Sequence, residues 1–408
     1  MKKLDVYLAT SDASDRGRLV GTLAASERRL FFEYDADFLD DPLWLSPFKL
    51  PPERGLHEHR DLAFGPLFGL FDDSLPDGWG LLLMDRYFRR QGVLLDGVSP
   101  LDRLAYLGRR TMGALTYYPP AEIEESDRSA LDLHDMAREA YQVLEGKGEE
   151  VLPQLLRAGG SPGGARPKVL VGVRGDQMIS GEDDLPEGYA GWLVKFPASD
   201  GASEEGRIEY AYSEMARAAG VKMPQTSLFM TAQGDAFFGV ERFDRQGNER
   251  RHVHTFGNLI HSNFRVPCCD YEMLLRVTRI LTKNQSDALC AFRLMVFNIL
   301  AHNRDDHVKN FAFVLGVPGD WRFAPAYDLT FAAGPGGEHT MTVAGEGRRP
   351  SLAHVLTVAQ GAGIEAAQAR AIVDEVAAAV ADWRRFADAA GIPAREVRRI
   401  EQAFCVLQ

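Results

Sequence analysis

The chain has 408 residues, of which 45% are hydrophobic and 25% are charged, a composition typical of a folded globular protein. This length exceeds what one hydrophobic core usually organises, so we expect more than one lobe. The formal net charge of −12 argues against broad binding of nucleic acid or of an anionic membrane by this chain alone.

The four cysteines form neither a CxxC pair nor a disulfide-like framework, which favours a reducing compartment. The amino terminus shows no apolar signal segment, and no long apolar run follows it. We therefore expect a cytoplasmic protein with no membrane association.

Short apolar runs separated by turn residues dominate the first 120 residues. The runs at 4–9, 18–24, 29–35 and 113–119 are typical of strands. The segment LPDGWGLLLMDRYFRRQG at 75–92 has a turn-like entry followed by apolar residues at helical spacing. We therefore expect a small α/β amino-terminal module over 1–120.

Residues 121–250 predict a strand-rich lobe, and residues 251–408 predict a helical one. Strand-like runs occupy 167–175, 191–199 and 226–245, and one amphipathic helix at 209–220 interrupts them. Helical spacing then dominates, at 286–303 and in the Ala-rich stretch 365–391. This order indicates a two-lobed α+β fold with a cleft between the lobes.

Polar side chains crowd the stretch AHNRDDHVKNFAFV at 301–314, between a predicted helix and a predicted strand. The simplest interpretation is a solvated turn. However, a hairpin signal at 316–331 brings Asp328 back toward Asp305 and Asn310. A carboxylate that orients a hydroxyl, together with an amide oxygen and a second carboxylate as Mg²⁺ ligands, is what phosphoryl transfer from ATP requires. The spacing therefore favours the catalytic and metal-binding loops of a kinase.

Three further segments bear on this hypothesis. RAGGSPGGARPK at 157–168 is typical either of a phosphate-binding loop or of a flexible linker. Lys195 lies among apolar neighbours in a predicted strand, where a kinase-like fold keeps its phosphate-binding lysine, although many such lysines are merely exposed at an edge. Either Glu209 or Glu214 is within reach as its ion-pair partner. FFGVERFDR at 237–245 has the position of a kinase hinge.

Taken in order, these segments resemble the HipA-like serine/threonine kinases, the toxins of bacterial type II toxin–antitoxin modules. The matching segments cover about residues 155–335 and are SPGGARPK, VKF, EYAYSEMARAAGVKMP, VERFDR, RRHVHTFGNLIH, NRDDHVKNFAF and APAYDLTF. RLVGTL and LPDGWG resemble the family's amino-terminal module. The resemblance implies a two-lobed protein-kinase-like fold with a small α/β amino-terminal module, a strand-rich ATP-binding lobe and an all-helical carboxy-terminal lobe.

The resemblance also implies the residues of an ATP and Mg²⁺ site. Asp305 is the implied catalytic base, and Asn310 and Asp328 are the implied Mg²⁺ ligands. Ser161 matches an autophosphorylated serine, whose phosphate would add negative charge where the ATP phosphates bind and so switch the enzyme off. Glu209 is the ion-pair candidate. The implied ATP-binding residues are Lys168, Lys195, Gly163, Gly164, Ala165 and His307, with Glu241 and Phe243 facing adenine and Asp244 facing the ribose.

By the same resemblance, the substrate is a component of translation such as an aminoacyl-tRNA synthetase. The implied partner is a DNA-binding antitoxin of the HipB type, so this acidic chain would reach DNA only indirectly. Whether Asp305 or Asp306 faces the substrate hydroxyl stays open, and the spacing to Asn310 favours Asp305.

Three alternatives stay open. A phosphotransferase acting on a small alcohol or an aminoglycoside would use the same base and metal ligands. A zinc hydrolase would use His302, His307 and Asp305, but the two histidines do not fall on one helical face. A catalytically restrained corepressor would act with a DNA-binding antitoxin, and the intact acidic and lysine residues of the predicted site argue against it.

Overall fold

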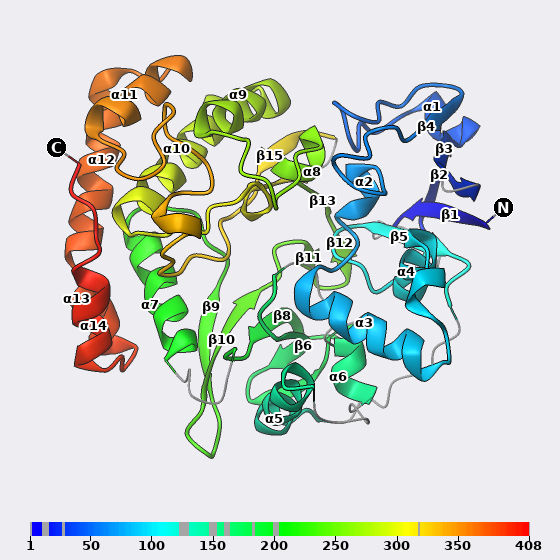
Figure 1. Ribbon diagram of the computed structural model, residues 1–408, viewed down its shortest axis with the longest axis horizontal. Coiled ribbons are helices and arrows are strands. Elements are labelled where there is room, and N and C mark those ends of the chain that lie inside the picture. Colours follow the sequence, from blue (N-terminus) through cyan, green and yellow to red (C-terminus); the bar gives the residue numbers. More distant parts are fainter. Residues whose placement is uncertain are drawn as a thin grey trace.

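The computed structural model describes residues 2–9, 16–26, 29–121, 130–146, 153–158, 164–181, 184–198, 204–316 and 319–407. Figure 1 shows an amino-terminal part (blue to cyan), a strand-rich part (green) and a mainly helical part (yellow to red). Across the described segments, every helix is too short or too polar to span a bilayer.

An antiparallel five-stranded sheet in the order β4-β3-β2-β1-β5 forms the centre of the amino-terminal part. Leu4, Val6 and Leu8 alternate with less buried residues along β1, the pattern of a sheet with one face on the core. The strands are β1 (Lys2–Leu8), β2 (Arg18–Ser26), β3 (Arg29–Tyr34), β4 (Leu56–Glu58) and β5 (Leu115–Tyr118). The helices are α1 (Ala36–Asp40), α2 (Gly69–Asp72), α3 (Gly78–Arg90), η1 (Leu95–Gly97) and α4 (Pro100–Leu107), where η denotes a 3₁₀ helix.

A second antiparallel five-stranded sheet, in the order β7-β6-β8-β10-β9, forms the strand-rich part. Three valines of this sheet are buried against apolar side chains of α5 and α6; they are Val169, Val171 and Val194. The strands are β6 (Lys168–Arg174), β7 (Gln177–Ser180), β8 (Ala190–Lys195), β9 (Thr226–Met230) and β10 (Ala236–Glu241). The helices are α5 (Leu133–Leu144), α6 (Pro153–Ala158) and α7 (Glu205–Ala218).

Helices dominate the rest of the chain, which also contains the hairpin β11 (Arg245–Gln246) and β12 (Glu249–Arg250). The hairpin predicted at 316–331 is present and consists of β14 and β15. The strand β13 pairs with β14, so the sheet has the order β13-β14-β15. These strands are β13 (His252–Thr255), β14 (Ala312–Leu315) and β15 (Trp321–Phe323). The helices are α8 (Phe256–Ile260), α9 (Tyr271–Thr282), α10 (Gln285–Leu300), η2 (Val308–Asn310), η3 (Pro335–Gly337), α11 (Leu352–Gly361), α12 (Ala366–Ala381), α13 (Trp383–Ala389) and α14 (Ala394–Glu401).

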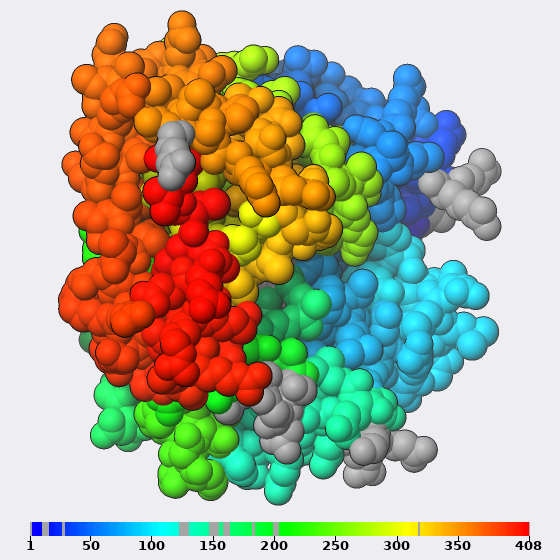
Figure 2. Space-filling view, turned by 60° about the vertical axis from the view of Figure 1, so that its left-hand side comes forward, coloured from blue at the N-terminus to red at the C-terminus, as the bar shows by residue number. Residues whose placement is uncertain are grey.

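The division of the chain into modules at residues 120 and 250 remains our proposal. The buried apolar clusters extend across both of these boundaries. One continuous apolar cluster joins the amino-terminal sheet to α8, α9, α10 and α12. A second cluster lies under the strand-rich sheet and includes Trp79 and Leu83 of α3. Figure 2 shows α11 to α14 (orange and red) covering one side of the molecule, with the amino-terminal part (blue and cyan) at the opposite edge.

Candidate active site

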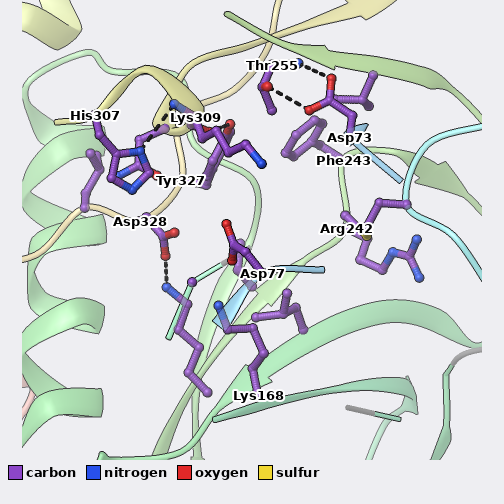
Figure 3. A pocket seen from close by; sticks show the side chains of 18 of the residues that line it. Asp73, Asp77, Lys168, Arg242, Phe243, Thr255, His307, Lys309, Tyr327 and Asp328 are labelled. Atoms are coloured by element: carbon purple, nitrogen blue, oxygen red, sulfur yellow. Dashed lines mark hydrogen bonds and ion pairs between the residues drawn. The ribbon is translucent and has the colours of Figure 1, made fainter. Parts of the chain in front are cut away.

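A cavity lies where the three parts of the molecule meet (Figure 3). It contains most of the residues that the sequence predicts for an ATP and Mg²⁺ site. These residues are Gly164, Lys168, Lys195, Glu241, Phe243, Asp305, His307, Asn310 and Asp328. Residues more than 130 positions apart therefore line one site.

Two predicted residues, Ser161 and Gly163, lie outside the described part of the chain. Ala165 is described and follows Gly164 at the entry to β6, although it does not line the cavity.

The prediction that Asp244 faces the ribose does not agree with the position of this side chain. Asp244 is fully buried and does not line the cavity. Its carboxylate accepts hydrogen bonds from Arg242 at 2.8 Å, from Arg245 at 2.6 Å and from the Gly113 N–H at 2.8 Å. Asp244 therefore joins the hinge segment to the amino-terminal part.

The predicted lysine–glutamate ion pair is present. Lys195, at the end of β8, contacts Glu209 of α7 at 2.5 Å, and it also forms an ion pair with Asp328. Glu209 is buried and accepts a second bond, from Arg166 at 2.8 Å. Glu214 instead forms an ion pair within α7. Because Glu209 holds two cations, it fixes the position of Lys195 relative to α7.

The strand register places the two site lysines side by side, because Lys168 on β6 pairs directly with Lys195 on β8. Burial alone would lower the pKa of Lys195, but the carboxylates of Asp328 and Glu209 raise it above the usual lysine value. Burial lowers the pKa of Lys168 to about 8. Burial alone would raise the pKa of Asp328, but Lys195 and Lys168 hold it well below the usual carboxyl range. These charges form a compact site for a polyanion and a cation.

The loop after α10 presents Asp305 to the cavity. The Asn310 side-chain Nδ2 donates to the Asp305 backbone carbonyl at 2.6 Å, and this bond closes the loop. His307 caps η2 by accepting from the Lys309 N–H at 3.3 Å. Asp305 is an exposed residue that lines the cavity. Partial desolvation of its carboxylate raises the pKa of Asp305, and the negative charges of Asp328 and Asp306 add to the effect.

The structure shows which of the two adjacent aspartates faces the cavity. Asp306 is buried, and its carboxylate accepts bonds at 2.7 Å from Tyr271 Oη, His339 Nδ1 and the Thr340 N–H. Three donors therefore occupy Asp306 as a support of the loop, which leaves Asp305 accessible to a substrate.

Asn310 and Asp328 fit the chemistry of a Mg²⁺ site. Because Asn310 uses its Nδ2 on the backbone, its amide oxygen is available as a ligand. Among the described residues, no three His, Cys, Asp or Glu side chains gather as a metal site. Mg²⁺ that binds with a nucleotide needs only one or two carboxylates, since phosphates and water supply the other ligands.

In the hinge segment, most of the backbone N–H groups that could bind adenine are already used. The Glu241 N–H donates to the Gln225 carbonyl at 2.8 Å, and the Arg242 N–H donates to the Gly191 carbonyl at 2.9 Å. In the described structure the Phe243 N–H makes no backbone bond. The Phe243 ring stacks on Tyr327, with ring centres 5.8 Å apart, and both side chains line the cavity.

Sequence reasoning missed the contribution of the amino-terminal part to the cavity. Asp73 and Asp77 reach it from the segment between α2 and α3 (Figure 3). Asp73 accepts bonds from the Thr255 N–H at 2.9 Å, Thr255 Oγ1 at 2.7 Å and His254 Nδ1 at 2.5 Å. The sequence signal was the turn-like entry to the helix at 75–92, but local spacing does not tell which distant residues such a turn contacts.

His302 and Arg304 support the loop. The His302 ring stacks on Phe331, with ring centres 5.4 Å apart, and it does not line the cavity. Arg304 donates to the backbone carbonyls of Gly337 and Arg348. The zinc-hydrolase alternative needs His302 beside Asp305 in one site, and this arrangement does not support it.

Comparison with known proteins matches both the amino-terminal and the carboxy-terminal part of the chain to a domain family. The model of the HipA N-terminal domain matches residues 12–118, and that of the HipA-like C-terminal domain matches residues 160–384, more than half of the chain.

One curated relative is "Putative kinase Y4dM" of Sinorhizobium fredii strain NGR234, which is 27% identical over 291 residues. The alignment covers 65% of this chain and 65% of the relative's length, so the chain spans slightly less than two thirds of that relative.

A solved structure of HipA from Shewanella oneidensis MR-1, in a complex with HipB and operator DNA, has the same fold with a TM-score of 0.72. The two chains are 17% identical, and the match covers 98% of this chain and 95% of the other. The carboxy-terminal lobe was expected to be all-helical, but it also contains the strands β13, β14 and β15. The expected two-lobed, kinase-like fold is otherwise confirmed, and the chain belongs to the HipA family.

Proposed function

We propose that this protein is an ATP-dependent serine/threonine protein kinase that acts as the toxin of a HipA-type toxin–antitoxin module. One observation carries the proposal: Asp305 is accessible in the same cavity as Asn310, Asp328 and the Lys195–Glu209 ion pair. Kinase chemistry needs a hydroxyl acceptor, hard oxygen ligands and a fixed lysine in one place.

Each group has a separate role in this proposal. Asn310 and Asp328 would hold Mg²⁺, which neutralises phosphate charge when it is bound. Lys195 and Lys168 would bind the phosphates, and the Phe243 N–H would bind adenine. Asp305 would orient the serine hydroxyl of a protein substrate for in-line attack on the γ-phosphorus of ATP, with ADP as the leaving group, and would accept the hydroxyl proton. The raised pKa of Asp305 makes its carboxylate a stronger base toward the hydroxyl proton.

Membership of the family supports a proposal for the partner and for the substrate. The Shewanella HipA was solved with HipB and operator DNA, which supports a HipB-type antitoxin as the partner of this chain and DNA as an indirect one. We further propose autophosphorylation of Ser161 and a substrate in translation, such as an aminoacyl-tRNA synthetase. A small-molecule phosphotransferase is the competing outcome.

The test compares Asp305→Asn with the matched control Asp320→Asn, whose exposed carboxylate lies at the β14–β15 turn outside the cavity. Phosphate transfer from radiolabelled ATP to protein is measured with Mg²⁺ and with EDTA. Loss of a positioned base costs about 10²- to 10⁴-fold in rate, so Asp305→Asn should lose labelling while its melting temperature stays near that of the wild type.

Phosphoproteomics after induction of wild type and of Asp305→Asn would identify Ser161 and the substrate together. Undiminished labelling in Asp305→Asn would overturn the role of this residue. Label that enters alcohols or aminoglycosides, but no protein, would favour the small-molecule phosphotransferase.

A further inference from the structure

The amino-terminal part contacts the end of the Gly-rich loop through the first residues of α3. The Trp79 N–H donates to the Gly164 carbonyl at 3.2 Å, and the indole Nε1 donates to the Lys168 carbonyl at 3.0 Å. The backbone and the side chain of one residue therefore hold both ends of the segment that leads from the Gly-rich loop into β6.

Gly78 brings the two backbones into direct contact. A Cβ atom on Gly78 would lie 2.6 Å from the Ala165 Cα and 2.6 Å from the Gly164 carbonyl oxygen. Gly78 also has a φ of +42°, in the left-handed region that favours glycine. No other residue fits here unless the end of the Gly-rich loop moves away from α3.

Movement of this segment would change the phosphate end of the cavity. A Cβ atom on Gly164 would lie 2.5 Å from Lys168 Nζ, so the loop backbone passes directly over that ammonium group. Figure 3 shows the Asp77 carboxylate pointing into the cavity above Lys168. Asp77 Oδ1 is buried and has no hydrogen-bond partner among the described residues. The start of α3 therefore contributes both a contact and a charge to the site.

The rest of α3 connects this contact to two cores. Trp79 and Leu83 are buried with residues of β6 and β8. Met84 and Phe88, on the same helix, are buried with Tyr106 of α4. Because α3 packs on both sides, it connects the strand-rich sheet to the amino-terminal part.

From these contacts we propose that the start of α3 forms part of one wall of the nucleotide site through Asp77, and that Gly78 and Trp79 are positioning residues that hold residues 164–168, at the end of the Gly-rich loop, where they accept ATP. The proposal rests on the proposed function, because it assigns ATP to this cavity. The amino-terminal part would thus set the affinity of the kinase for its nucleotide.

The chain offers a matched pair of glycines for the test. Gly92 follows the other end of α3, has a φ of +73°, and has nothing within 4 Å of the position of its Cβ. Gly78→Ala and Gly92→Ala therefore both place an alanine at a positive φ, but only Gly78→Ala collides with the loop. Calorimetric titration of the full-length chain with ATP and Mg²⁺, together with melting temperatures, separates the two effects.

We expect the dissociation constant for ATP to rise at least about tenfold in Gly78→Ala, because displacement of the loop end costs at least one hydrogen bond to a charged phosphate group. Gly92→Ala should bind like the wild type at a similar melting temperature. Trp79→Phe removes the Nε1 donor together with part of a buried ring, and it should weaken ATP binding about two- to tenfold. If Gly78→Ala does not fold, Trp79→Phe decides the question.

Equal ATP affinity in wild type, Gly78→Ala and Trp79→Phe would overturn this inference alone. A wild-type chain that binds no ATP would overturn the proposed function and this inference with it.

Discussion

The two lysines that face each other across β6 and β8 have the same side chain but different surroundings. Lys195 contacts two carboxylates, whose charges raise its pKa. Lys168 is as deeply buried, and burial lowers its pKa to about 8. Lys195 therefore stays charged at physiological pH, whereas Lys168 loses its proton within a pH range that experiments can reach.

This difference predicts how nucleotide binding depends on pH. Below about pH 8 Lys168 carries a charge that attracts phosphate, and as pH rises through that value the charge and the attraction are lost. The affinity for ATP should therefore fall as pH rises from 7 to 9, by about tenfold, the effect of one hydrogen bond to a charged group. Calorimetric titration with ATP across this range measures the effect.

Lys168→Arg is the control, because a guanidinium keeps its charge throughout this range. Its ATP affinity should change little between pH 7 and pH 9, whatever its absolute value. An equally steep fall in Lys168→Arg would show that another group causes the pH dependence.

The junction between α2 and the segment β13–α8 carries several buried or half-buried polar contacts near the site. Asp73 accepts bonds from His254, from Thr255 and from Asn258 Nδ2 at 2.8 Å. Burial alone would raise the pKa of Asp73, but His254 and Lys309 hold it below the usual value. One carboxylate thus joins the amino-terminal part to the strand that leads into the helical part.

Asp73→Ala should lower the free energy of unfolding by about 3 kcal/mol or more, because it leaves several buried donors without an acceptor. Asp40→Ala is the control, since Asp40 is 76% exposed and its nearest cation lies 4.0 Å away. That change should stay within about 0.5 kcal/mol of wild type. Urea unfolding monitored by circular dichroism compares the two variants, and equal losses would contradict the assigned role of Asp73.

The sequence predicted elements better than contacts between them. The strands β6, β8 and β10 and the helices α3 and α10 overlap the predicted segments, because their apolar spacing is local. The Ala-rich stretch forms two helices that meet at Asp382, which the continuous apolar spacing did not indicate. Asp305 and Asn310 were found because they are five residues apart, whereas Asp77 and Gly164 line the same cavity only because of the fold. Asp244 was misplaced because a motif gives the position of a residue but not the direction of its side chain.

Across the whole molecule, one apolar core crosses the proposed module boundary at residue 120. Phe71 of α2 is fully buried in the cluster that also contains Phe256 and Leu259 of α8. The Phe71 ring also contacts Phe32 of β3, with ring centres 5.0 Å apart. Packing of this kind couples the stability of the amino-terminal sheet to that of the helical part.

Phe71→Ala should therefore destabilise both parts together, by about 3 to 5 kcal/mol, the usual cost of removing a buried phenylalanine ring. Native-state hydrogen exchange should show faster exchange in α8 and β13 as well as in β2 and β3. Phe48→Ala removes the same ring from a residue that is already 38% exposed in the amino-terminal part, and it should leave exchange in α8 unchanged. If Phe71→Ala accelerates exchange only in the amino-terminal strands, the two parts unfold independently and the shared core does not couple them.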